Sequence, residues 1–225
     1  MTTVRTVDVT PADTTGMKKL IYAVNLAKNP RGVNSTGIVV GFGTGGAGGV
    51  TYPTTGGPLT DAPTFVRNTL TTAPTSGSIT IILGAVGTTD IDPADIGSQM
   101  RFAVYARASR AATGVSQSAG WYGASGFLSG AAGASDSLVA NTWKALPAIT
   151  ATVPANTTRF QLQVTFPVAS IPGLAAGDTL DATAFLIHKP VTGYDGSYFD
   201  GSSPIGSAWQ GTAHASRSTK IVGIG

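Results

Sequence analysis

The chain of 225 residues contains no cysteine and no glutamate, since all 11 of its acidic residues are aspartate. The absence of cysteine excludes disulfide bridges, thiolate metal sites, iron–sulfur clusters and cysteine nucleophiles. Charged residues make up only 11% of the chain, although glutamate and lysine usually build the exposed faces of helices. With 30 glycines and 13 prolines as well, the composition excludes a helical bundle and favours a β protein with many loops.

Long apolar runs and clusters of positive charge are also missing. No stretch reaches the roughly 20 apolar residues that a membrane helix needs, and residues 1–10 lack the apolar block of a secretory signal. The net charge of +3 comes from dispersed basic residues, whereas nucleic-acid-binding proteins concentrate theirs on one face or stretch. We therefore expect synthesis in the cytosol, no membrane insertion and no nucleic-acid partner.

Strand-like segments recur between clusters of glycine, proline, serine and threonine. In residues 159–166 apolar and polar side chains alternate, which is typical of a half-buried strand. No window shows a capped apolar stripe of helical period, so we predict an all-β protein, a jelly-roll or galactose-binding-like β-sandwich. The clearest strand candidates are 20–26, 37–42, 78–83, 100–108, 143–153, 159–166 and 179–188.

Residues 43–58 are so rich in glycine and threonine that we predict a loop there. Just before it, Gly41-Phe-Gly-Thr-Gly-Gly46 matches the G-x-G-x-x-G string of dinucleotide-binding proteins. That chemistry needs a following helix whose N-terminus meets the pyrophosphate, and Ala47-Gly-Gly-Val-Thr-Tyr-Pro53 cannot form one. A chance match in a glycine-rich chain is the better interpretation.

The candidates for catalysis are sparse. There are two histidines, His188 and His214, and no G-x-S-x-G nucleophile elbow. Aspartates lie close together at positions 90, 92 and 95, at 178 and 181, and at 195 and 200. A glycosidase needs two carboxyl groups about 5–10 Å apart across a cleft, but several of these aspartates stand beside proline or glycine in turns. We predict no enzymatic activity, and a hydrolase using Asp pairs and His214 remains the alternative.

Asp90, Asp92 and Asp95 offer hard oxygen ligands of the kind that calcium prefers. The segment lacks the glycine and the terminal glutamate of an EF-hand loop. We expect no cofactor, with a structural calcium ion at these three residues as the alternative.

Aromatic side chains either stack on sugar rings or fill a core. Trp143, at the start of a strand candidate, is predicted in the core. Trp121 and Tyr122 are neighbours and point to opposite faces of a strand, so at most one of them faces the core. The candidate carbohydrate-binding residues are Trp121, Tyr122 and Tyr105.

Three stretches together suggest a known kind of module. The first is Asn25-Leu-Ala-Lys-Asn-Pro30, the second comprises residues 99–107, 120–126 and 142–143, and the third comprises residues 153–159 and 176–181. In their order and spacing they resemble the jelly-roll carbohydrate-binding modules of families four and nine, over roughly residues 20–190. Arg31-Gly32 departs from the Ser-Phe that normally follows the first stretch in those modules.

The C-terminal region carries a second motif, which begins Tyr198-Phe-Asp-Gly and continues Trp209-Gln-Gly-Thr-Ala-His214. It resembles a signature of minor tail proteins of tailed bacteriophages, mostly those of actinobacteria, where it follows a carbohydrate-binding-like jelly roll. Ala213 replaces the usual proline, and Ile205-Gly206 makes a short connection. The matching residues are Tyr198, Phe199, Asp200, Gly201, Trp209, Gly211, Thr212 and His214.

The resemblance implies a non-enzymatic virion protein at the tail tip or baseplate, assembled in the host cytoplasm. Its expected partners are other phage structural proteins, further copies of itself and glycan of the host envelope. We expect an N-terminal docking arm at 1–19, the jelly roll at 20–190 and a C-terminal hairpin extension at 191–225. A purely structural tail or capsid decoration protein is the alternative, and the C-terminal motif would then be a hairpin anchored by a buried Trp209.

Overall fold

The computed structural model describes residues 20–35, 37–84, 91–192, 194–202, 206–213 and 218–224. The expected docking arm at 1–19, Asp90 and His214 lie outside the described residues. The regular structure that is described consists of β-strands and two single-turn 3-10 helices, η1 (Pro93–Asp95) and η2 (Val168–Ser170). Within the described ranges, no helix has the length and apolar character needed to cross a membrane.

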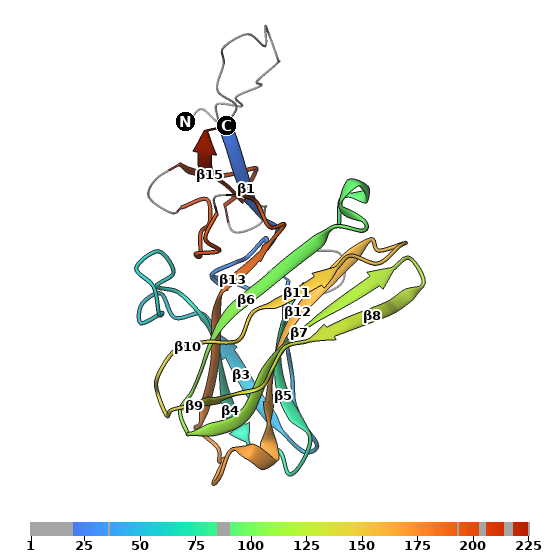
Figure 1. Ribbon diagram of the computed structural model, residues 1–225. Helices are drawn as coiled ribbons and strands as arrows, with labels where there is room; N and C mark the ends of the chain where they lie inside the picture. Colours follow the sequence, from blue (N-terminus) through green and yellow to red (C-terminus); the bar gives the residue numbers. More distant parts are fainter. Residues whose placement is uncertain are drawn as a thin grey trace, which may run out of the picture.

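Two antiparallel sheets face each other and form a sandwich (Figure 1). The first, called here the β6 sheet, has the order β10-β6-β13-β4-β3, and β11 also pairs with β6. Its strands are β3 (Ala47–Thr51), β4 (Val66–Thr72), β6 (Gln99–Ala108), β10 (Lys144–Ala145), β11 (Ile149–Thr152) and β13 (Thr179–His188). The second, called the β12 sheet, has the order β2-β5-β12-β7-β8, and β9 also pairs with β7. Its strands are β2 (Ile38–Gly41), β5 (Ser78–Leu83), β7 (Ala112–Gly123), β8 (Gly126–Ala132), β9 (Asp136–Leu138) and β12 (Arg159–Pro167).

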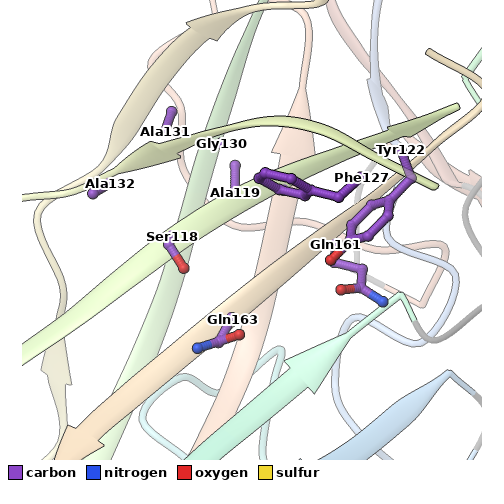
Figure 2. A pocket seen from close by; sticks show the side chains of 10 residues that line it. Ser118, Ala119, Tyr122, Phe127, Gly130, Ala131, Ala132, Gln161 and Gln163 are labelled. Atoms are coloured by element: carbon purple, nitrogen blue, oxygen red, sulfur yellow. The ribbon is translucent and has the colours of Figure 1, made fainter.

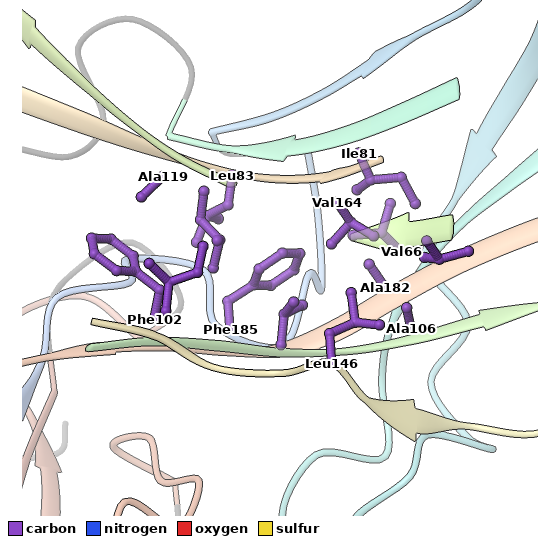
Figure 3. Packing of buried hydrophobic residues seen from close by; sticks show 14 of the residues in the cluster. Val66, Ile81, Leu83, Phe102, Ala106, Ala119, Leu146, Val164, Ala182 and Phe185 are labelled. Atoms are coloured by element: carbon purple, nitrogen blue, oxygen red, sulfur yellow. The ribbon is translucent and has the colours of Figure 1, made fainter. Parts of the chain in front are cut away.

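The core lies between these two sheets (Figure 3). The alternation read from the sequence holds in β12, where Phe160, Leu162, Val164 and Phe166 are fully buried. Phe102 and Phe185 approach them from the β6 sheet. Removing such a side chain from water contributes about 1.5–3 kcal/mol, so the alternating strands supply the apolar surface that holds the sheets together. The predicted all-β jelly-roll sandwich is confirmed.

A third, smaller sheet has the order β1-β15-β14 and is called here the terminal sheet. Its strands are β1 (Leu20–Asn25), β14 (Ser207–Trp209) and β15 (Ser218–Ile224), and it lies at one end of the sandwich (Figure 1). The expected boundary at residue 20 assigns β1 to the jelly roll, whereas the structure pairs β1 with β15. The C-terminal extension is therefore a sheet that incorporates the first described strand.

The attachment of the terminal sheet depends on a β-bulge in β13. The register shifts between Thr183 and Leu186, and Ala184 has a φ of 53° in the left-handed region. The side chain of Asn25 satisfies the freed backbone groups. It donates to the carbonyl oxygen of Phe185 at 3.1 Å and accepts from the amide of Ile187 at 3.0 Å. A fully buried amide thus replaces ladder hydrogen bonds at the bulge.

Two local predictions were wrong. Residues 43–58 contain β3, which pairs with β4 at the edge of the β6 sheet. Its residues are largely exposed, and an edge strand tolerates glycine because it needs little side-chain packing. The strand predicted at 143–153 is divided into β10 and β11 on either side of Pro147, which has no amide hydrogen to donate to a ladder.

Candidate functional site

The structure separates the three predicted sugar-stacking residues. Trp121 is 2% exposed and lies in the core, with its ring centroid 5.4 Å from that of Phe102. This burial corrects its selection as a stacking residue, because its ring is covered on the inner face of β7. Tyr122 points outward from the same strand, and Tyr105 lies on the outer face of the β6 sheet. Tyr122 and Tyr105 therefore lie on opposite sides of the sandwich and cannot share one ligand.

Trp143 is not in the core between the sheets. It is half-buried at the edge of the β6 sheet, where its indole nitrogen donates to the carbonyl oxygen of Gly56 at 2.7 Å. Its ring packs edge-to-face on Phe65 at 5.3 Å, and the guanidinium of Arg107 lies over it at 4.4 Å. Trp143 therefore anchors the long loop between β3 and β4 through Gly56.

A hollow of about 310 Å³ lies on the outer face of the β12 sheet, over β7, β8 and β12. Tyr122 and Phe127 stand at one end of it, packed edge-to-face with ring centroids 5.4 Å apart (Figure 2). Phe127 is 63% exposed, so its ring is available to a ligand. We call this site the Tyr122–Phe127 hollow; its lining is Ser118, Ala119, Gly120, Tyr122, Phe127, Gly130, Ala131, Ala132, Gln161 and Gln163.

Glycines form the floor beneath the two rings. Gly120 and Gly130 face each other across β7 and β8. A Cβ atom at Gly120 would lie 3.1 Å from the ring of Tyr122, and one at Gly130 would lie 3.5 Å from the ring of Phe127. The absence of these side chains lets the rings lie close to the strands, which keeps the hollow open beside them.

Polar side chains of β7 and β12 line the rest of the hollow. Gln161 is opposite Gly120 and Gln163 is opposite Ser118 in the ladder. The amide of Gln163 donates to the hydroxyl of Thr165 at 2.9 Å, which fixes its orientation. An apolar ring platform beside hydroxyl and carboxamide groups can hold a molecule with one apolar face and a hydroxyl rim.

Phe127 was missed in the sequence, although a signal for it exists. Trp121-Tyr122-Gly123 and Gly126-Phe127-Leu128 flank a two-residue connection, which is the spacing of a tight hairpin. In the structure Tyr122 pairs with Phe127 across that hairpin. Recognising the hairpin would have placed the two rings side by side.

The C-terminal motif is directed inward. Phe199 and Asp200 are fully buried, and Asp200 accepts hydrogen bonds from the guanidinium of Arg31, with Nη2 at 2.9 Å from Oδ1. The hydroxyl of Tyr198 donates to Oδ2 of the same carboxylate at 2.9 Å. Burial and the charge of Asp200 raise the pKa of Tyr198 well above its ordinary value, so the phenol stays protonated as a donor.

The remaining described residues of the motif lie where the C-terminal extension meets the jelly roll. Trp209 is half-buried, and its indole nitrogen donates to the hydroxyl of Ser202 at 3.1 Å. A Cβ atom at Gly201 would lie 2.2 Å from Cγ of Trp209, so glycine permits the contact. Gly211 and Thr212 are exposed at the end of the described segment. The geometry is that of a structural lock between the extension and the jelly roll.

Three of the aspartates considered for catalysis, Asp178, Asp181 and Asp200, are held in ion pairs with arginine. Asp181 is fully buried and accepts from both Arg67 and Arg107, at 2.9 Å and 2.6 Å. Asp178 pairs with Arg110, and Asp200 with Arg31. These carboxylates lie within the β6 sheet and its flanks, away from the Tyr122–Phe127 hollow.

The residues considered for calcium have other roles where they are described. Asp92 caps η1 by accepting from the amide of Ala94 at 2.9 Å, and Asp95 lies 3.4 Å from the ammonium of Lys189. Across the described residues, no group of three or more acidic, histidine or cysteine side chains is close enough together to hold a metal ion.

Known proteins resemble this chain in fold. No protein-family model matches the chain, and no curated protein matches its sequence. The structure is similar to an arabinose-bound α-L-arabinofuranosidase, MgGH51 (TM-score 0.51, 13% identity, 78% of this chain and 27% of that one). It is similar to the CBM22-1–GH10 modules of Clostridium thermocellum xylanase 10B, solved with xylohexaose (0.50, 12%, 80% and 30%).

A third similar structure is the enzymatically active domain of tailspike protein 4 of bacteriophage CBA120 (TM-score 0.48, 15% identity, 74% of this chain and 21% of that one). The chain spans less than a third of the length of each of these three structures. The similarity to the first two structures, at 13% and 12% identity, shows the jelly-roll fold.

Proposed function

We propose that this protein is a non-enzymatic component of a bacteriophage tail and that the Tyr122–Phe127 hollow binds glycan of the host envelope. The observation that carries the glycan-binding part is the ring pair of half-buried Tyr122 and exposed Phe127 above a glycine floor, with Gln161 and Gln163 beside it. A sugar ring presents an apolar face to an aromatic platform and a rim of hydroxyls to carboxamides. Two of the similar structures were solved with a sugar, arabinose or xylohexaose, which supports the proposal.

The proposal of a non-enzymatic role rests on the side chains of the hollow. Hydrolysis of a glycosidic bond by the usual route needs two carboxyl groups on either side of the scissile bond. The lining of the hollow contains hydroxyl, carboxamide and aromatic groups and no carboxylate among the described residues. Binding by stacking and hydrogen bonds is the chemistry that such a lining supports.

The proposal of a tail protein rests on the C-terminal motif. Phe199 and Asp200 of that motif hold the terminal sheet against the jelly roll, which is a reason for the motif to accompany such a domain. Several copies on one particle would raise the avidity of a weak sugar site. Residues 1–19 would dock the domain on its neighbours, and particles carrying a deletion of residues 1–18 would then lose the protein.

The glycan proposal is tested by measuring the affinity of the purified protein for polysaccharide extracted from host envelopes. Tyr122→Ala and Phe127→Ala should each weaken binding about tenfold, which corresponds to about 1.4 kcal/mol. Tyr105→Ala is the matched control, because the same residue type is removed from the outer face of the opposite sheet. Circular dichroism and thermal unfolding establish that each variant is folded.

Saturable binding that depends on Tyr122 and Phe127 but not on Tyr105 would support the proposal. Equal losses in all three variants would contradict the placement of the site. No binding, even by artificially multimerised protein, would leave the structural decoration protein as the better interpretation. Immunogold labelling of purified particles tests the tail location separately.

A further inference from the structure

Arg159 is the only charged residue in strands β2, β5, β7, β8 and β12, all of whose residues the structure describes. It is the first residue of β12 and lies on the outer face together with Gln161 and Gln163. In the ladder it is opposite Tyr122, and its guanidinium carbon lies 5.2 Å from the centroid of the Tyr122 ring. A single positive charge therefore stands at the aromatic end of the Tyr122–Phe127 hollow.

The guanidinium of Arg159 has no acidic partner within the described part of the chain, although other arginines do. Arg31 pairs with Asp200, Arg67 and Arg107 pair with Asp181, and Arg110 pairs with Asp178. The Nε of Arg159 is buried and makes no hydrogen bond among the described residues. A buried donor without a partner costs free energy.

Asp136 of β9 is the acidic residue in the described strands of the β12 sheet, and it lies too far from Arg159 to neutralise its charge. Asp136 of β9 pairs with Val115, whereas Arg159 pairs with Tyr122. Seven residues along β7 separate the two positions, or roughly 23 Å at 3.3 Å per residue. Asp136 is also held by the ammonium of Lys144 at 2.7 Å. Among the described strands of the β12 sheet, the outer face thus carries its positive charge at the Tyr122 end.

We infer that the ligand of the hollow is an anionic glycan, whose carboxylate or phosphate pairs with Arg159 while its sugar ring lies on the aromatic pair. This inference rests on the proposed glycan binding. A guanidinium presents parallel N–H donors that match either anion in a two-pronged hydrogen bond. Stacking on Tyr122 orients the guanidinium in advance, so less side-chain freedom is lost on binding. Arg159 and Gln161 are about 7 Å apart on the same face, which suits an acid group on one sugar unit.

The inference is tested with the host envelope polysaccharide, used untreated, after methyl esterification of its carboxylates, or after removal of its phosphodiesters with hydrogen fluoride. The protein variants are wild type, Arg159→Gln and Arg159→Lys, and Arg101→Gln is the control. Arg101 also lacks an ion pair among the described residues but lies on the outer face of the β6 sheet, so its loss changes the net charge equally. Affinities are measured at two or more salt concentrations, because pairing with an anion weakens as salt rises.

We expect Arg159→Gln to weaken binding of the untreated polysaccharide at least tenfold and to remove most of its salt dependence. Arg159→Lys should retain part of the affinity, and Arg101→Gln should bind like wild type. One of the two chemical treatments should weaken wild-type binding to the level of Arg159→Gln, and the effective treatment identifies the anion as carboxylate or phosphate.

Two results would overturn the inference and are distinguishable from failure of glycan binding itself. If binding depends on Tyr122 and Phe127 but is unchanged by Arg159→Gln and by both treatments, the glycan is neutral and only the inference fails. If Arg159→Gln and Arg101→Gln lose equal affinity, the effect is one of overall charge. If wild type binds none of the preparations, the proposed glycan binding fails as well.

Discussion

Arg31 and Asp200 lie 169 residues apart in the chain and form a two-pronged ion pair, with Nη2 of Arg31 2.9 Å from Oδ1 of Asp200. Arg31 directly follows the stretch Asn25-Leu-Ala-Lys-Asn-Pro30, and Asp200 belongs to the Tyr198-Phe-Asp-Gly segment. The residue after the first motif therefore pairs with a residue of the second. The ion pair joins the jelly roll to the C-terminal extension at a buried corner.

Asp200→Asn should destabilise the fold by about 3–5 kcal/mol, because removing one partner leaves the other charge buried without compensation. The side chain of Asp200 is fully buried and that of Arg31 is 13% exposed. Urea unfolding followed by tryptophan fluorescence measures the change. Asp136→Asn breaks an exposed ion pair with Lys144 and serves as the control, with little change expected. Similar unfolding midpoints for the two variants would contradict the assigned role of the buried pair.

Gly201→Ala should detach Trp209 from its place, since the added Cβ would lie 2.2 Å from Cγ of Trp209. Overpacking of this kind costs about 1–3 kcal/mol. The expected result is a lower unfolding temperature and a change in tryptophan emission. Gly49→Ala is the matched control, because a Cβ atom there meets nothing within 4 Å. An unshifted emission spectrum in Gly201→Ala would contradict the close contact between Gly201 and Trp209.

The stability of the protein should fall as the pH drops below about 6.5, through His188. Its ring is 3% exposed and packs edge-to-face on Tyr194 at 4.9 Å. Burial lowers the pKa of His188, a hydrogen bond with the carbonyl of Lys189 opposes this, and the charge of Arg101 lowers the pKa further.

Since the pKa of His188 in the folded protein lies below the unfolded value near 6.5, the unfolded chain binds the proton more readily. The stabilising contribution is complete above the unfolded pKa and is lost as the pH falls through the folded one. Urea midpoints measured from pH 8 to pH 5 should decline for wild type and less steeply for His188→Gln. Parallel declines would assign the effect to other groups.

Trp121→Ala should destabilise the protein by about 3–5 kcal/mol, because a fully buried ring is lost from a cluster with Phe102 and Phe160. Tyr122→Ala, one residue away on the opposite face, should cost much less. Thermal unfolding of the two variants side by side measures the difference. Comparable losses would mean that the outward ring is also part of the core, which would weaken its proposed role in binding.

The alternating strands could be predicted from sequence because one face of each is strongly apolar. β5 and β12 were found at nearly their observed bounds for that reason. β7 was missed, because its inward residues include Ala112, Gln117 and Ala119 and its outward residues include serine and glycine. A strand of small residues shows no periodic hydrophobicity, and only its pairing with β12 establishes it.

The candidate site could be predicted only in part. The sequence required Trp121 and Tyr122 to face opposite ways but could not decide which ring is buried, because that depends on the register with β12. To predict the place of Phe127 one must recognise the hairpin of β7 and β8, and to predict that of Arg159 one must know the same register of β7 with β12. The lock between Arg31 and Asp200 joins distant segments, so no local pattern reveals it.

The pairing of β1 with β15 has a mechanical consequence. Leu20 is opposite Ile224 at the outer end of the pair, and Asn25 is opposite Ser218 at the inner end. A force that pulls Leu20 and Ile224 apart acts along the hydrogen bonds, which in an antiparallel pair run across the strands. The bonds would then break one after another, as in a zipper, and not all at once. Under tension the terminal sheet would open first, while the sandwich that carries the hollow stays folded.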